Sequence, residues 1–70
     1  MPKLPGINHL RAIKAFRKAG FHIERESKHI LMFKGTLRVV IPRNNPVDGY
    51  TMAAIVREAG MSIDEFKKLL

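Results

Sequence analysis

The 70-residue sequence contains no cysteine, no tryptophan and a single tyrosine. Without thiols neither a disulfide framework nor a thiolate zinc site can form, and a reducing compartment is the expected environment. Apolar runs such as Ile30–Phe33 are far shorter than the roughly 20 residues that a membrane-spanning helix needs. The first six residues lack the apolar stretch of a signal peptide. We therefore expect a soluble, cytoplasmic protein with no membrane association.

Acidic side chains are also scarce. Six Asp or Glu stand against 13 Lys or Arg, which gives a formal net charge of +7 at pH 7. Residues 1–46 hold ten basic and two acidic side chains, whereas residues 47–70 hold three and four. Such a local excess predicts a polyanionic partner, because neutralised phosphates release condensed counterions. Taken alone, the charge is explained equally well by a surface kept soluble by lysine.

The length restricts the fold to one small domain covering residues 1–70. Apolar side chains make up 46% of the chain, enough for a single hydrophobic core. A two-domain enzyme, a Rossmann unit or a barrel would each need a much longer chain.

The first helical segment begins after Asn8, a favoured capping residue, and runs to about Ala19, with Gly20 as its stop. Apolar residues at intervals of three and four predict its buried stripe. The expected stripe is Leu10, Ala12, Ile13 and Phe16. The opposite face is basic, with Arg11, Lys14, Arg17 and Lys18. For this helix alone, an ordinary solvated face is favoured over a phosphate-binding one.

Two further helices are expected near the C-terminal end of the sequence. Thr51 is the expected cap of a helix that runs through Ala59, with Met52, Ile55 and Val56 turned inward. Residues 62–65 read Ser-Ile-Asp-Glu, a capping box that predicts a short last helix over residues 63–69.

Between the first two helices, three short runs predict strands over residues 21–25, 29–33 and 36–41. A two-residue loop at residues 34–35 would place Leu31 opposite Arg38 and His29 opposite Val40. The core face would then carry Ile30, Met32, Leu37, Val39 and Ile41. The outward face would carry His29, Leu31, Phe33, Thr36, Arg38 and Val40. The expected fold is α+β: a two-layer α-β-β-β-α domain with a three-stranded antiparallel sheet and a short C-terminal helix.

His29 is the side chain best placed for chemistry. If Glu26-Ser27 forms the loop before it, Glu24 faces His29, whereas a three-residue loop sets Arg25 opposite instead. Either arrangement leaves an exposed imidazole among cations. RNA carries its own nucleophile, the 2′-hydroxyl, so a proton-transfer group and phosphate-binding cations suffice for its cleavage. The three histidines share no metal-ligand spacing, and we expect no metal and no cofactor.

The outward face is too apolar for a purely solvated sheet, because Leu31, Phe33 and Val40 lie on it. Either a partner protein or the chain's own last helix would cover these side chains. A partner is the favoured interpretation.

Several of these residues, in their order along the chain, resemble the HicA toxin family of toxin–antitoxin pairs. Family members typically show Gly-Phe, Arg, Gly-Ser-His, Val-Pro and Ala-Gly-Leu-Ser at this spacing. The matching residues here are Leu4-Pro5, Lys18-Ala19-Gly20-Phe21, Arg25, His29, Val40-Ile41-Pro42-Arg43, Thr51, Ile55, Arg57-Glu58-Ala59-Gly60-Met61-Ser62 and Phe66.

The resemblance implies a fold like that of double-stranded-RNA-binding domains and the activity of a ribosome-independent mRNA interferase. It implies that His29, at the position of the family's Gly-Ser-His, is the catalytic residue. A HicB-type antitoxin is the implied protein partner. One departure is that Ser27-Lys28 stands in place of Gly-Ser, which removes easy access to positive φ in the turn and adds a cation.

The resulting functional hypothesis is a metal-independent endoribonuclease that acts on mRNA. His29 would act as general acid/base, and Lys28, Arg25 and Arg43 would hold phosphate. Arg38 and Lys34 are weaker candidates for contacts along the RNA backbone. The alternative is a non-catalytic RNA-binding module of the same fold, which would grip RNA by shape and 2′-hydroxyls. A pure protein-interaction domain is a third class.

Overall fold

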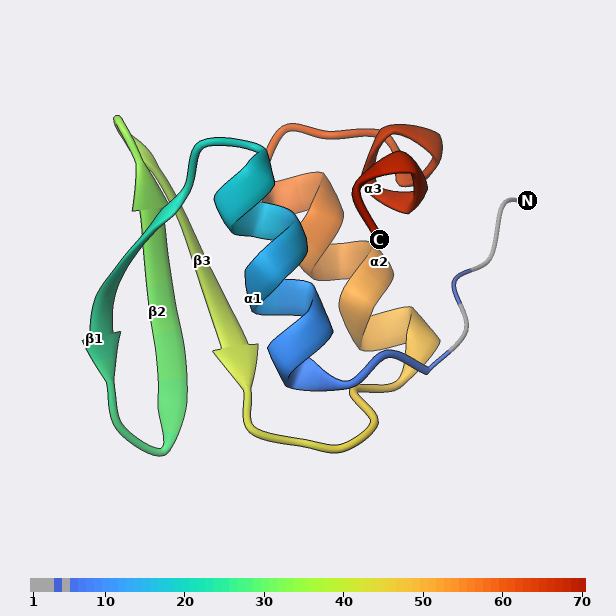
Figure 1. Cartoon of the computed structure of the whole chain (residues 1–70), viewed down its shortest axis with the longest axis horizontal. Coiled ribbons are helices and arrows are strands. Elements are labelled where there is room, and N and C mark those ends of the chain that lie inside the picture. The colour runs from blue at the N-terminus through green and yellow to red at the C-terminus, as the bar shows by residue number, and fades with distance from the viewer. Residues whose placement is uncertain (1–3, 5) are drawn as a thin grey trace.

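Three strands and three helices occur in the computed structural model, which describes residue 4 and residues 6–70 (Figure 1). Their order is α1 (His9–Lys18), β1 (His22–Glu26), β2 (His29–Lys34), β3 (Leu37–Pro42), α2 (Gly49–Glu58) and α3 (Ile63–Leu69). The strands form one antiparallel sheet in the order β1-β2-β3. The expected α+β class and the α-β-β-β-α order with a short last helix are confirmed. Residues 1–3 and 5, part of the segment expected to contain no signal peptide, lie outside the described residues.

The first two helices end in the same motif, which explains why glycine follows each of them. Gly20 has a φ of 100° and Gly60 a φ of 77°, a left-handed conformation that favours glycine. After α1, the Phe21 amide donates to the Phe16 carbonyl at 2.9 Å, and the Gly20 amide donates to Arg17. An equivalent pair of bonds closes α2. The first of these turns leads from α1 directly into β1, and the second leads from α2 toward α3.

The starts of the helices are set by side-chain caps. Asn8 accepts from the Leu10 amide at 2.8 Å, and Ser62 and Glu65 form the expected capping box of α3. For α2 the expected cap was wrong. Asp48 caps it, with Oδ1 accepting from the amides of residues 50 and 51, so the helix begins at Gly49. Thr51 lies inside the first turn, where its hydroxyl donates to Asp48 Oδ2 at 2.6 Å.

The turn between β2 and β3 differs from the expected one. Lys34 pairs with Leu37, so the two-residue loop is Gly35-Thr36 and not Lys34-Gly35. Gly35 has a φ of 60° at the first loop position, where a two-residue hairpin loop commonly needs a left-handed residue. The register shifts by two residues, which preserves the expected faces but changes the partners. Leu37, expected in the core, lies directly after the turn of the hairpin and is 39% exposed.

The hairpin between β1 and β2 contains a bulge, and neither expected register is correct. Ile23 pairs with Met32 and Arg25 with Leu31, so Glu24 is the extra residue. The chain turns at residues 27–28 without any positive φ outside glycine. The Ser27 amide donates to the His29 carbonyl at 3.1 Å, which closes this turn. Glu-Ser lacks the Gly or Asn that a tight two-residue loop prefers, so the turn moves on by one residue.

The core lies between the helices and the sheet. Phe16 of α1 is its centre, with ring centroids 5.4 Å from Phe21 and 5.0 Å from Phe66. The buried stripe of α1 is Ala12, Ala15 and Phe16. Leu10, expected on that stripe, is 64% exposed, because two residues correspond to more than half a helical turn from Ala12. The three inward residues expected for α2 are all buried.

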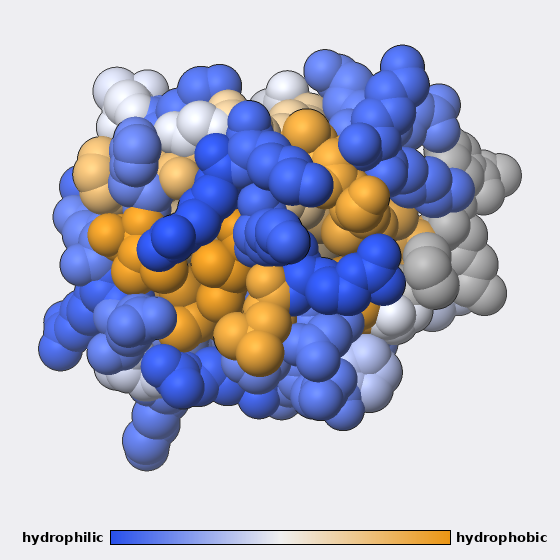
Figure 2. All heavy atoms as spheres, viewed as in Figure 1, coloured by the Kyte–Doolittle hydropathy of each residue, from blue (hydrophilic) through white to orange (hydrophobic). Residues whose placement is uncertain are grey.

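Helix α3 packs against α1 and α2, and the helices lie to one side of the strands in Figure 1. Among the described residues, no helix is both long and apolar enough to span a membrane. In the view of Figure 2, hydrophobic residues reach the surface over the strands and α1, and hydrophilic residues surround them.

Candidate functional site

The sheet has two unlike faces, and the candidate site lies on the one turned away from the helices. Successive strand residues alternate between faces. The inner face is fixed by Ile30, Met32, Val39 and Ile41, each 2% exposed or less. Register then assigns the other face. We call it the outer face; it carries His22, Glu24, Arg25, His29, Leu31, Phe33, Arg38 and Val40.

His29 is the first residue of β2 and lies opposite Pro42 of β3. Its backbone carbonyl accepts two hydrogen bonds from Ser27, one from the amide at 3.1 Å and one from Oγ at 3.4 Å. The residue is exposed. Within residue 4 and residues 6–70, no hydrogen bond or ion pair uses its imidazole. The ring is therefore anchored through the backbone and open to a ligand.

Three expected phosphate-binding residues lie at the same end of the sheet as His29. Lys28 precedes it in the turn, and Arg43 follows its cross-strand partner Pro42. Arg25 pairs with Leu31 and is therefore diagonal to His29, a position that places the two residues about 7–8 Å apart. All three are exposed. We call His29, Lys28, Arg25 and Arg43 the histidine end of the sheet.

The two weaker candidates lie elsewhere. Arg38 is opposite Phe33, four residues along β2 from His29 or about 13 Å, and its Nη2 is 3.7 Å from Glu24 Oε1. Lys34 is at the far end of β2, where its Nζ donates to the Ala19 carbonyl at 2.9 Å. The structure does not bring Lys34 to His29, and Arg38 has a carboxylate partner.

Two contacts on the outer face were not expected from the sequence. The His22 ring lies 5.8 Å from the Phe33 ring between centroids, and Glu24 reaches Arg38 across the sheet. Alternation along the strand already placed His22 and Glu24 outward, but the partners depend on the bulge. His22 is about 13 Å from His29, too far for the two imidazoles to share one proton.

Between the two histidines runs an apolar strip. Leu31 and Val40 pair directly across the strands, and Phe33 follows on the same face. Val40 is 49% exposed, while the other two are half-buried. The alternative that the last helix covers these residues is wrong, because α3 packs on α1 and α2. The strip remains open to an external partner.

The titratable groups with shifted pKa values lie away from this face, at the helix starts. Hydrogen bonds from Thr51, first from its hydroxyl and then from its amide, lower the pKa of Asp48. The Ser62 amide and then its hydroxyl lower the pKa of Glu65. Within the described ranges, 4 and 6–70, no group of three His, Cys, Asp or Glu side chains could hold a metal ion.

The histidine end thus combines one exposed imidazole with three exposed cations that form no ion pair within the described part of the chain. Such an arrangement can bind phosphate and move a proton beside it. Comparison of the chain with protein-family models, with curated proteins and with solved structures finds no match.

Proposed function

We propose that this chain is an endoribonuclease of the HicA toxin type that cleaves mRNA in the cytoplasm, with His29 as its general acid/base. The supporting observation is the histidine end: an exposed imidazole with Lys28, Arg25 and Arg43 at the same edge of an uncovered face. The resemblance in sequence, from Gly20-Phe21 to the residues around Ser62, points to the same activity.

The chemistry follows from the substrate. The ribose 2′-oxygen attacks the adjacent phosphorus, the bond from phosphorus to the 5′-oxygen breaks, and a 2′,3′-cyclic phosphate forms. The imidazole takes the proton from the 2′-hydroxyl or donates one to the departing 5′-oxygen. A single ring cannot fill both roles at once. Either it passes the same proton across or water supplies the second role.

The cations have separate tasks. Lys28 precedes His29, and Arg43 follows the cross-strand partner of His29; both would stabilise the charge that develops on the phosphorane. Arg25, on the neighbouring strand, would hold the next phosphate. We give Arg38 a minor part because Glu24 neutralises it, and Lys34 none at this site because its ammonium binds the end of α1.

The apolar strip suits a protein partner. Leu31, Phe33 and Val40 would be buried by a HicB-type antitoxin that docks over the outer face. Docking there would also cover His29, so the free chain would be active and the complex silent.

The test is cleavage of a labelled single-stranded RNA by the purified chain with a metal chelator present. His29→Ala should lower the rate by about 100-fold or more, while RNA affinity stays within about twofold. His22→Ala is the matched control, since it removes an exposed histidine from the same face at the other end. Induction of the same chains in cells should arrest growth and degrade transcripts only where His29 is intact.

Equal cleavage by the wild type and His29→Ala would contradict the assignment. No cleavage by the wild type, with tight RNA binding, would favour the alternative of a non-catalytic RNA-binding module. Lys28 in place of the family's serine favours that alternative, since it adds a phosphate contact beside the ring. Both the nuclease and the RNA-binding module predict that log affinity for RNA falls linearly with log salt concentration, with a slope of about −0.7 per phosphate contact. For a protein-interaction domain, the affinity for its partner would change little with salt.

A further inference from the structure

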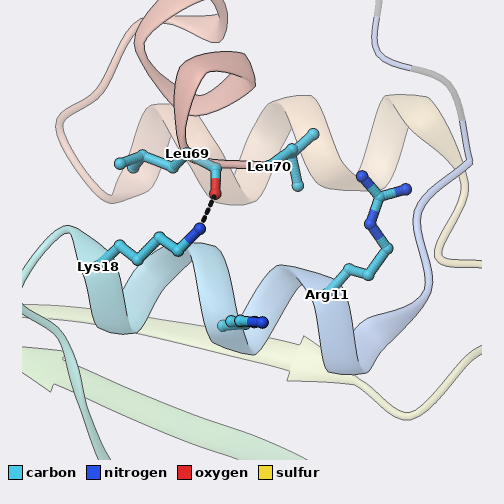
Figure 3. Close-up of a pocket in the computed structure, with 5 residues that line it drawn as sticks. Arg11, Lys18, Leu69 and Leu70 are labelled. Carbon is cyan, nitrogen blue, oxygen red and sulfur yellow. Dashed lines mark hydrogen bonds between the residues drawn. The ribbon is translucent and has the colours of Figure 1, made fainter.

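A second cationic surface lies on the helical side of the molecule, against the end of α3. Arg11, Lys14 and Lys18 follow one another at intervals of three and four residues, so they form one stripe along α1. Together with Leu69 and Leu70 they line a shallow hollow of about 160 Å³. In Figure 3 the side chains of Arg11 and Lys18 extend from opposite ends of α1 toward Leu70 and Leu69. We call these three cations the α1 stripe.

Among the described residues, no acidic group forms an ion pair with the α1 stripe. Helix α1 contains no Asp or Glu, and within residue 4 and residues 6–70 the only ion pair joins Glu24 to Arg38. Like charges at these spacings repel one another and destabilise a helix. A stripe of like charges without an acidic partner is typical of a binding surface.

The stripe is also partly preorganised. Lys18 Nζ donates to the Leu69 carbonyl at 3.3 Å, which fixes the hollow at one end (Figure 3). Arg11 and Lys14 have no such bond in the described part of the chain. About 10 Å of helix separates the backbones of Arg11 and Lys18, enough to meet successive backbone phosphates.

The positive surface continues past the end of α3. A neighbouring hollow shares Leu69 and is lined by Lys34 and Lys68, with Glu65 as its acidic member. The Glu65 carboxylate is already occupied by the cap of α3, since it accepts from the Ser62 amide at 3.0 Å. Two ammonium groups and one carboxylate line this hollow, so its formal charge is positive.

We propose that the α1 stripe is a second phosphate-binding surface for RNA, separate from the histidine end. This proposal rests on the proposed function for the identity of the polyanion, RNA, but it does not require that the chain cleaves RNA. A row of cations over a concave, apolar floor fits a chain of phosphates with ribose against Leu69 and Leu70. A lipid surface would instead require the apolar side chains to project beyond the cations.

The experiment measures RNA binding in the His29→Ala background, so that the probe stays intact. The probe is a 5′-labelled single-stranded 20-nucleotide RNA, titrated by fluorescence anisotropy at several salt concentrations. Arg11→Gln with Lys14→Gln should reduce the slope of log affinity against log salt by about 1.4, the value for two phosphate contacts, and weaken binding about tenfold at 0.1 M salt. Lys18 is left in place to preserve its bond to Leu69.

The matched control is Arg57→Gln with Lys67→Gln, which removes two exposed cations, and hence the same net charge, outside the hollow. Its slope should fall by less than about 0.3. The exchange variant Arg11→Lys with Lys14→Arg should bind like the parent, because charge and position are kept. Circular dichroism and thermal melting confirm folding of each chain.

Equal losses in the α1 double variant and its control would overturn the proposal, since net charge alone would then explain them. It would also be overturned if the α1 variant lost binding to phosphatidylserine vesicles in cosedimentation but kept RNA affinity. The result is independent of catalysis. If the wild type does not cleave RNA but the α1 double variant still shows the reduced salt slope, the endoribonuclease assignment is contradicted and the RNA-binding surface is supported.

Discussion

The two faces of the sheet are made from alternate residues of the same strands, yet one face is buried under the helices and the other is accessible. On β2, Ile30 and Met32 are 2% and 0% exposed, while His29 and Leu31, which alternate with them, lie on the outer face. The inner face holds the helices and supplies stability. The outer face holds a histidine, cations and an apolar strip that nothing in the described chain covers. A period of two residues thus separates the side chains that form the core from those that stay accessible within six residues of strand.

The largest expected effect lies on the inner face. Met32→Ala should lower the free energy of unfolding by about 2–5 kcal/mol, because it leaves a cavity where the side chain is 0% exposed. A 70-residue domain has only about 4–10 kcal/mol in total. Leu31 directly precedes Met32 but lies on the outer face. Leu31→Ala should therefore lower the free energy of unfolding by about 1 kcal/mol or less. Urea denaturation of both variants measures the difference.

Equal losses for Met32→Ala and Leu31→Ala would break the comparison, since they would mean that both faces of β2 support the fold. The effects on binding should have the reverse order. If the proposed antitoxin or RNA binds the outer face, Leu31→Ala should weaken its affinity more than Met32→Ala does.

A smaller effect is expected for the ion pair on the outer face. Glu24 and Arg38 approach to 3.7 Å with side chains 38% and 64% exposed, so solvent screens them. A double-mutant cycle with Glu24→Gln and Arg38→Gln should give a coupling of at most about 1 kcal/mol that declines with added salt. A coupling above about 2 kcal/mol would show that the outer face contributes to folding after all.

The smallest effect concerns pH and belongs to the helical layer. The pKa of Asp48 is lowered below its ordinary value of 3.8, chiefly by the Thr51 hydroxyl, so the unfolded chain binds a proton more readily. This contribution is fully present above pH 3.8 and is lost as the pH falls through the folded pKa.

Asp48→Asn keeps a good capping residue but cannot titrate. It should be slightly less stable than the wild type at pH 7 and equal to it near pH 2. Thr51→Val, which removes the first cause of the shift, should flatten the same dependence in part. Thermal melting across pH 2–7 measures both, and a wild type whose advantage grows toward low pH would contradict the sign.

Local signals predicted the helices well because their causes are local. The caps at Asn8 and Ser62 and the glycine after α1 act within four residues, and each is where the sequence placed it. The cap of α2 was predicted at the wrong residue because Asp48 and Thr51, three positions apart, are both good capping residues. Local sequence preference alone does not decide between them.

Strand faces were predictable but strand partners were not. Parity alone puts His29 outward, and any even shift of register leaves it there. The actual pairs depend on which loop position Gly35 takes and on an extra residue at Glu24, neither of which shows in the alternation. The histidine end could therefore be anticipated in its main members, while the contact of Glu24 with Arg38 could not.

The single unpaired residue in the first hairpin fixes the sign of the charge beside the imidazole. In an uninterrupted ladder Glu24 would stand opposite Leu31, and Arg25 would stand opposite Ile30, pointing toward the helices. The insertion moves the guanidinium into the place that a carboxylate would have held. Deleting Arg25 would close the bulge with Glu24 opposite Leu31, and would therefore replace the cation diagonal to the imidazole with a carboxylate without altering any residue of the core.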